Sequence, residues 1–251
     1  MAFTDISRGL FQGILSIAPR DFNGARTGGY RDLGQIDLFT IDPKPKFEDI
    51  MDSRQSPAGT IDHILTEVDF AAKIRALDIG MQNWALANYG EWSGAVSAGT
   101  SVTEDVVLYN GTKTHLAHPG VTSVTVSGAV LDTDYTINAA SGTINVLASS
   151  TTIPVGTPLT TTVTYNHAAY NGAVEAFTIP QKFFSLHLEG INVAQAGQPV
   201  IVDVWQWAPD PVKMLNFIDK KHFTQEIDGK MLKDELITTD GLSKYYKVKK
   251  A

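Results

Sequence analysis

The feature that most constrains the fold is a strict alternation in the segment VDFAAKIRA, residues 68–76. Apolar side chains take every second position, and aspartate, lysine and arginine lie among the positions between them. Successive side chains of a β-strand point to opposite faces, so this period of two predicts a strand with one buried side and one solvent-facing side. A helical pattern is convincing only in residues 78–90, from Asp78 as a capping residue to Gly90 as a stop signal.

The region from Glu104 to Tyr170 is rich in Thr, Val, Gly and Ser and holds short strand patterns about every ten residues, which is typical of an all-β module. One of them, DYTINAASGTINVL (residues 134–147), reads as a hairpin hinged on a Ser-Gly turn. We therefore predict a mostly β, β-sandwich or barrel-like fold with one flanking α-helix. Residues 104–170 form an inserted module, and residues 1–103 and 171–251 form the main domain.

The segment from Asp42 to Gly59 reads as a long loop. It contains Pro43, Pro45 and Pro57 among many charged residues. Loops of this length are uncommon in compact domains and are usually functional or disordered.

Composition excludes several classes of function. The chain has no cysteine, which removes disulfides, zinc–thiolate sites and cysteine nucleophiles. No apolar run approaches the ~20 residues of a membrane span. The net charge is −7, and only the last eight residues, with four lysines, are strongly basic. An acidic body argues against a site that grips nucleic-acid phosphates.

No motif predicts catalysis, and we expect no enzyme, metal or cofactor. His115 and His118 lack a third ligand, and Asp132 and Asp134 lack the further oxygen ligands of a calcium loop. One alternative is an aromatic platform that stacks sugars. Its candidate residues are Trp84, Trp92, Trp205, Trp207, Tyr109, Tyr135 and Tyr165.

Several segments, taken in chain order, resemble the major tail tube proteins of long-tailed bacteriophages. They are RDFNGARTGGYRDLG, SRQSPAG, TEVDFAAKIRAL, NWALANYG and EGINVAQAGQPVIVDV. The resemblance implies that six copies close into a ring and that rings stack into a hollow conduit for DNA ejection. It places the protein in the virion tail, assembled in the host bacterial cytoplasm without a membrane.

The resemblance also implies partners and contact residues. The partners are further copies of the chain, the tape measure protein, the tail terminator and distal tail proteins, while phage DNA passes without specific binding. The long loop becomes a candidate inter-ring contact, through Asp42, Lys44, Lys46, Phe47, Asp49, Arg54 and Gln55. Glu67 and Asp69 are candidate bore-facing residues. Candidate terminal contacts are Phe3, Tyr245, Tyr246 and Lys247.

Two other readings remain open. A secretion-system tube subunit shares the ring-and-tube plan but normally lacks a β insertion. An adhesive or carbohydrate-binding β protein would instead present an aromatic patch and bind glycans.

Overall fold

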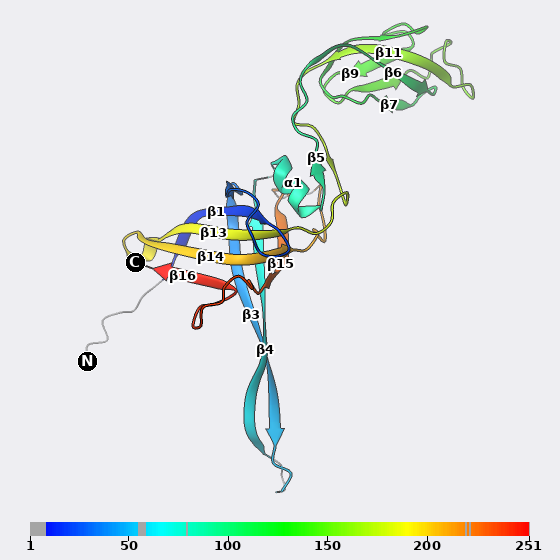
Figure 1. The fold of residues 1–251 in the computed structure, drawn as a ribbon. Helices are drawn as coiled ribbons and strands as arrows, with labels where there is room; N and C mark the ends of the chain where they lie inside the picture. Colours follow the sequence, from blue (N-terminus) through cyan, green and yellow to red (C-terminus); the bar gives the residue numbers. More distant parts are fainter. Residues whose placement is uncertain (1–8, 55–58, 79, 219, 221, 251) are drawn as a thin grey trace. The chain divides into compact units, whose positions relative to one another are not determined.

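The computed structural model describes residues 9–54, 59–78, 80–218, 220 and 222–250. The chain divides into two compact units, the first formed by residues 1–92 and 174–251 and the second by residues 93–173 (Figure 1). It is mostly β, with 53% strand and 4% helical residues and several antiparallel sheets, consistent with a β-sandwich-like fold. The predicted fold class is thereby confirmed.

The first unit is built on an eight-stranded sheet whose strands are all antiparallel to their neighbours. Its order is β2-β1-β13-β14-β15-β4-β3, and β16 also pairs with β14. The strands are β1 (Phe11–Arg20), β2 (Arg31–Asp32), β3 (Ile36–Met51), β4 (Thr60–Ala76), β13 (Phe183–Asn192), β14 (Gln198–Pro209), β15 (Gln225–Leu232) and β16 (Tyr246–Lys250).

The core of this unit lies on one face of the sheet. Trp207, Ile74 and Leu186 are fully buried there, and Ala87 of the helix packs against the same cluster. The buried positions of β4 are Ala72, Ile74 and Ala76, the apolar positions of the alternation seen in the sequence. The period of two in this segment therefore sets which face of the sheet is covered.

The helix α1 (Met81–Ala87) is shorter than predicted. Its N-cap is Gly80, which has no side chain to cap the helix, whereas the predicted cap Asp78 accepts a hydrogen bond from the Gly80 N–H at 3.1 Å. After α1, β5 (Glu91–Trp92) pairs with β12 (Val174–Glu175), and the short 3-10 helix η1 (Val193–Gln195) follows β13.

The predicted loop from Asp42 to Gly59 is wrong over most of its length. Residues 36–51 form β3, which pairs with β4 down to Met51 opposite Thr60. β3 is the edge strand of the sheet, and an edge strand tolerates proline because the missing N–H can face away from its neighbour. Pro43 and Pro45 are two residues apart, so both nitrogens point to the same side of the strand. They lie opposite Phe70 and Val68 without interrupting the ladder.

The second unit contains two three-stranded antiparallel sheets, β6-β11-β8 and β7-β10-β9. Residues from both sheets share one buried cluster, as in a sandwich, with Tyr135, Ile144 and Tyr165 almost fully enclosed. The strands are β6 (Gly99–Leu108), β7 (Lys113–His115), β8 (Val121–Val126), β9 (Tyr135–Asn138), β10 (Thr143–Val146) and β11 (Leu159–His167).

The hairpin DYTINAASGTINVL is formed by β9 and β10, with Ile137 opposite Ile144. The unit's boundaries differ from the predicted residues 104 and 170. Glu104 lies in the middle of β6, opposite Val163, so a boundary there would cut a strand. The small polar residues before it resemble a linker in composition but form the first half of that strand.

Candidate assembly interface

The outer part of the β3–β4 hairpin extends beyond the sheet. β4 pairs with β15 only from Phe70 to Ala76, and its earlier residues pair with β3 alone. We call residues 47–54 and 59–65 the arm (Figure 1). An isolated two-stranded hairpin is marginally stable in water at best. Contact with a partner would therefore increase the stability of the arm.

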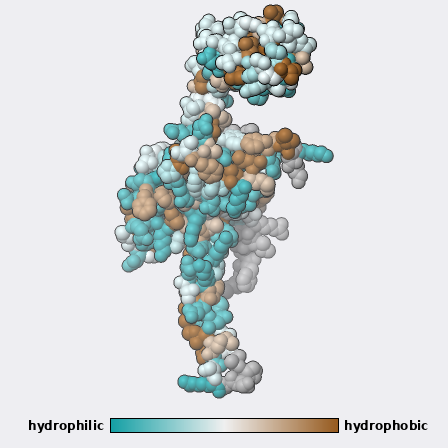
Figure 2. Space-filling model, turned by 90° about the vertical axis from the view of Figure 1, so that its right-hand side faces the viewer, coloured by the Kyte–Doolittle hydropathy of each residue, from teal (hydrophilic) through white to brown (hydrophobic). Residues whose placement is uncertain are grey.

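Both faces of the arm carry apolar side chains, and all of them are well exposed. Phe47 lies opposite Leu65 on one face, and Ile64 and Ile50 lie on the other. Figure 2 shows apolar side chains among hydrophilic ones along this hairpin. The apolar residues that are between 43% and 65% exposed are Phe47, Ile50, Met51, Ile61, Ile64 and Leu65. Exposed apolar patches mark interaction sites.

The arm is also acidic, with four carboxylates, on Glu48, Asp49, Asp52 and Asp62, against one arginine, Arg54. Phe47 stacks on the His63 ring with centroids 4.2 Å apart, and His63 Nδ1 lies within hydrogen-bond distance of Asp49.

The predicted inter-ring residues fall into three groups. Phe47, Asp49 and Arg54 lie on the arm. Asp42, Lys44 and Lys46 lie on β3 at the base of the arm. Gln55 lies outside the described residues.

The candidate bore-facing residues Glu67 and Asp69 belong to a ladder of ion pairs, which we call the charged face. Lys46 Nζ lies 2.7 Å from Glu67 and 3.6 Å from Asp69, and Lys230 lies 2.9 Å from Asp69. Farther along β4, Lys73 pairs with Glu226 at 2.7 Å. The other pairs are Arg75–Asp37, Arg75–Glu226, Lys73–Asp228 and Lys213–Asp228.

Residues of these pairs have shifted pKa values, among them Asp69 and Lys46. The hydrogen bond from Lys230 lowers the pKa of Asp69, and the hydrogen bond to Glu67 raises the pKa of Lys46. Both shifts favour the charged forms, so the face carries compensated charges of both signs.

The candidate terminal contacts have partners within the chain. Tyr245 and Tyr246 pack against Phe70 with ring centroids 4.5 and 5.7 Å away. Lys247 is exposed on β16 and lies opposite Asp203. The lysine-rich end is thus a strand that pairs with β14. Phe3 lies outside the described residues.

The strand β16 also completes a charge cluster that the sequence did not suggest. Lys249 Nζ lies 2.9 Å from Asp203, and His187 Nδ1 lies 2.6 Å from the same carboxylate. Burial opposes ionisation of Asp203, but hydrogen bonds from Lys249 and His187 outweigh it and lower the pKa. The three residues come from β16, β14 and β13, which are distant in the sequence.

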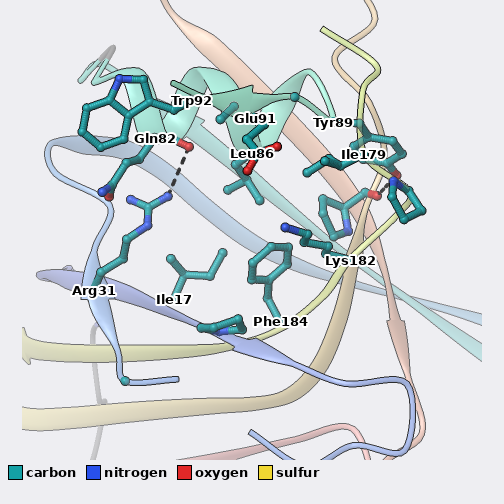
Figure 3. Close-up of a pocket in the computed structure, with 16 residues that line it drawn as sticks. Ile17, Arg31, Gln82, Leu86, Tyr89, Glu91, Trp92, Ile179, Lys182 and Phe184 are labelled. Atoms are coloured by element: carbon teal, nitrogen blue, oxygen red, sulfur yellow. Dashed lines mark hydrogen bonds between the residues drawn. The ribbon is translucent and has the colours of Figure 1, made fainter. Parts of the chain in front are cut away.

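A pocket of about 370 Å³ lies between α1 and the sheet of the first unit (Figure 3). Ile17 and Phe184 form its floor, Arg31 and Gln82 lie on one side, and Lys182 lies on the other. The further lining residues are Pro19, Gly29, Ala85, Leu86, Tyr89, Gly90, Glu91, Trp92, Ile179, Pro180 and Pro209. No single stretch of sequence contains this set, so no motif could have predicted the pocket.

Hydrogen bonds hold the walls of the pocket in place. Arg31 Nη1 donates to Asn83 Oδ1 at 2.8 Å, which ties β2 to α1. Tyr89 donates its hydroxyl proton to the carbonyl of Pro209. Burial lowers the pKa of the Arg31 guanidinium, which nevertheless stays charged at neutral pH.

In the second unit, His118 stacks on His167 with centroids 4.0 Å apart and lies 2.7 Å from the Tyr165 hydroxyl. His115 instead contacts Thr143. Within the described part of the chain, no three His, Asp or Glu side chains are grouped as metal ligands would be. Trp207, Tyr135 and Tyr165 are fully buried, so they cannot belong to a sugar-stacking platform.

A family model described as "Protein of unknown function UCP028589" matches residues 9–249. No curated protein matches the chain. Among the described residues, no helix has the length and apolar character to cross a membrane.

Proposed function

We propose that this chain, which belongs to the family of proteins of unknown function UCP028589, is a structural subunit of a bacteriophage tail tube. In this proposal six copies close into a ring, and rings stack into a hollow conduit for DNA ejection. The observation that carries the proposal is the arm, a two-stranded hairpin with uncovered apolar side chains on both faces. The resemblance in the sequence supplies the kind of assembly.

The arm supports a stacking contact because burying it would be favourable. Burial of apolar surface contributes about 25 cal/mol per Å², and Phe47, Ile61 and Leu65 are each about half exposed or more. A copy of the chain that covers these side chains also stabilises a hairpin that has no third strand.

The sheet edges support a lateral contact between copies in a ring. β2 pairs with β1 at Ser16 and Ile17, and the Leu33 N–H donates to the carbonyl of Leu15, so in the described structure the outer edge of residues 11–14 has no neighbouring strand. The outer edge of β3 is also free among the described residues, but Pro43 and Pro45 remove N–H donors from it, so β1 is the better candidate. Unpaired edges template pairing with another chain, and closure by rotation turns such a contact into a ring.

The charged face suits the wall of a conduit. DNA carries about one negative charge per ~1.7 Å of its axis, and rows of unpaired lysines would hold it. Lys46, Lys73 and Lys230 are each within 2.9 Å of a carboxylate of the same chain. Their charge is compensated, so a bore lined by this face would let DNA slide.

The proposal is tested by replacing arm residues Phe47, Ile50 and Ile64 with serine. All three side chains are exposed, so we expect the subunit to keep its fold and its unfolding midpoint. Negative-stain electron microscopy and sedimentation velocity should show tubes or stacked rings for the parent chain and no stacking for the variant.

The matched control replaces Val155, which is 84% exposed in the second unit, with serine. This variant should assemble like the parent. Equal assembly of the arm variant and the parent would overturn the proposal that the arm stacks the rings.

A further inference from the structure

We infer that the pocket beside α1 in one copy of the chain receives the arm of a second copy. This inference rests on the proposed function and names the receptor for the arm, which neither the sequence nor the family match assigns. It is carried by three features of the first unit: the apolar lining of the pocket, the charges of its rim, and the positions of arm and pocket along β4.

The lining of the pocket matches the apolar surface of the arm. Leu86, Ile179 and Phe184 present hydrocarbon to the pocket, and its volume of about 370 Å³ lies in the range of about 300–1,000 Å³ typical of binding sites. The pocket therefore has room for a cluster of side chains. The arm offers such a cluster in Ile50 and Ile64, which lie on the same face of the hairpin as Glu48.

The charges of the two surfaces are complementary. The rim of the pocket carries Arg31 and Lys182 against one carboxylate, Glu91. Neither cation takes part in an ion pair among the residues that the structure describes. The arm carries four carboxylates against one arginine. Opposite potentials steer association and fix the register of a complex.

The geometry of β4 makes the contact intermolecular. The arm reaches along β4 to Leu65, whereas α1 begins at Met81, shortly after β4 ends at Ala76. The stretch of β4 from Leu65 to Ala76 spans roughly 36 Å at about 3.3 Å per residue, so the arm lies far from the pocket of its own chain. Head-to-tail contacts of this kind generate open filaments when the rotation does not close, as stacked rings require.

Cysteine cross-linking tests the contact directly, because the chain has no cysteine of its own. One preparation carries Ile50→Cys on the arm, and a second preparation, with a size tag, carries Gln82→Cys at the pocket. The two are mixed and treated with a short bismaleimide, and heterodimers are counted on a denaturing gel. We expect at least tenfold more heterodimer than in a mixture of Ile50→Cys with Lys233→Cys, an exposed position that does not line the pocket.

A charge exchange in the same assay tests the assignment of the rim. Lys182→Glu in the pocket preparation should lower the heterodimer yield severalfold. Adding Glu48→Lys to the arm preparation should restore most of it. Both side chains are exposed, so neither change disturbs a core.

The outcomes separate this inference from the proposed function. Tubes that form without preferential cross-linking at Gln82 would overturn the pocket as receptor and leave the tube proposal standing. Preferential cross-linking in a protein that forms no ring or tube would support the contact and contradict the tube. Loss of yield in Lys182→Glu without recovery by Glu48→Lys would overturn the charge pairing.

Discussion

Gly142, between β9 and β10, shows how one residue can decide the stability of a unit. Its φ is +62°, and a Cβ built on it would lie 2.1 Å from the carbonyl oxygen of His118. Gly128 has a comparable φ of +80° with nothing within 4 Å of such a Cβ. Alanine substitutions at these two positions therefore distinguish the cost of a steric clash from the cost of backbone strain alone.

We predict that Gly142→Ala lowers the free energy of unfolding of the second unit by about 3 kcal/mol or more, because it combines strain with a clash. Gly128→Ala should cost only about 1–2 kcal/mol, the strain alone. Hydrogen-exchange mass spectrometry in increasing urea measures this unit separately. Equal losses in the two variants would contradict the clash.

The charged face predicts a pH dependence with a defined sign. Lys230 lowers the pKa of Asp69 in the folded protein. The pair therefore stabilises the fold above the pKa of an unfolded aspartate, about 3.9, and this stabilisation is lost as the pH falls through the lowered pKa of Asp69. Glu226 raises the pKa of Lys73 in the folded protein. The pair therefore stabilises the fold below the pKa of an unfolded lysine, about 10.4, and this stabilisation is lost as the pH rises through the raised pKa of Lys73. Between about pH 5 and 9 the face should be insensitive to pH.

The Lys230→Ala variant tests this assignment at a single carboxylate. Its removal should move the pKa of Asp69 up, towards the ordinary value, as followed by carboxyl NMR. The control is Lys233→Ala. Lys233 is exposed and forms no ion pair with a carboxylate of the charged face among the described residues. An unchanged Asp69 titration in Lys230→Ala would show that the lysine does not act on it.

Pro43 and Pro45 explain why the sequence predicted a loop where the structure has a strand. Proline and charge clusters usually mark loops, but this signal is local and takes no account of strand position. In an edge strand, the N–H that proline lacks need not remove a hydrogen bond to the neighbouring strand. A strand that is exposed on both faces also favours charged side chains. The residue pattern could therefore not distinguish a loop from a free-standing hairpin.

Among the elements, the β9–β10 hairpin was predictable because its pairing is local. Ile137 and Ile144 alternate with polar neighbours and are joined by a turn that contains a glycine. The start of the second unit was not predictable, because residues 99–103 pair with β11, more than fifty positions later in the sequence. The same limit hid the pocket, whose walls come from β1, β2, α1 and β13.

The second unit should fold by itself, because its two sheets bury a core of their own. We predict that residues 93–173 expressed alone give a β-type circular dichroism spectrum and one cooperative thermal transition. A disordered spectrum would contradict the division into units.

The reciprocal deletion is a matched test. Trp92 and Val174 are ladder partners of β5 and β12, and such pairs lie about 4.5–5.5 Å apart. A short Gly-Ser linker in place of residues 93–173 should therefore leave the first unit folded.

At the scale of the whole molecule, the sheet of the first unit depends on long-range pairing. β14 contacts β13 on one edge and both β15 and β16 on the other, and β1 at the start of the chain pairs with β13. The alternation in β4 indicated a sheet but not its order. The proposed assembly would extend this long-range pairing, because only other copies would cover the open strand edges and the arm.

Cryo-electron microscopy of the purified, concentrated full chain tests the central claim most directly. The account predicts hollow tubes of stacked six-membered rings, with β3–β4 hairpin density crossing from each ring to the next beside α1. Particles that remain monomers or closed oligomers of other symmetry, with the hairpin uncovered, would contradict it.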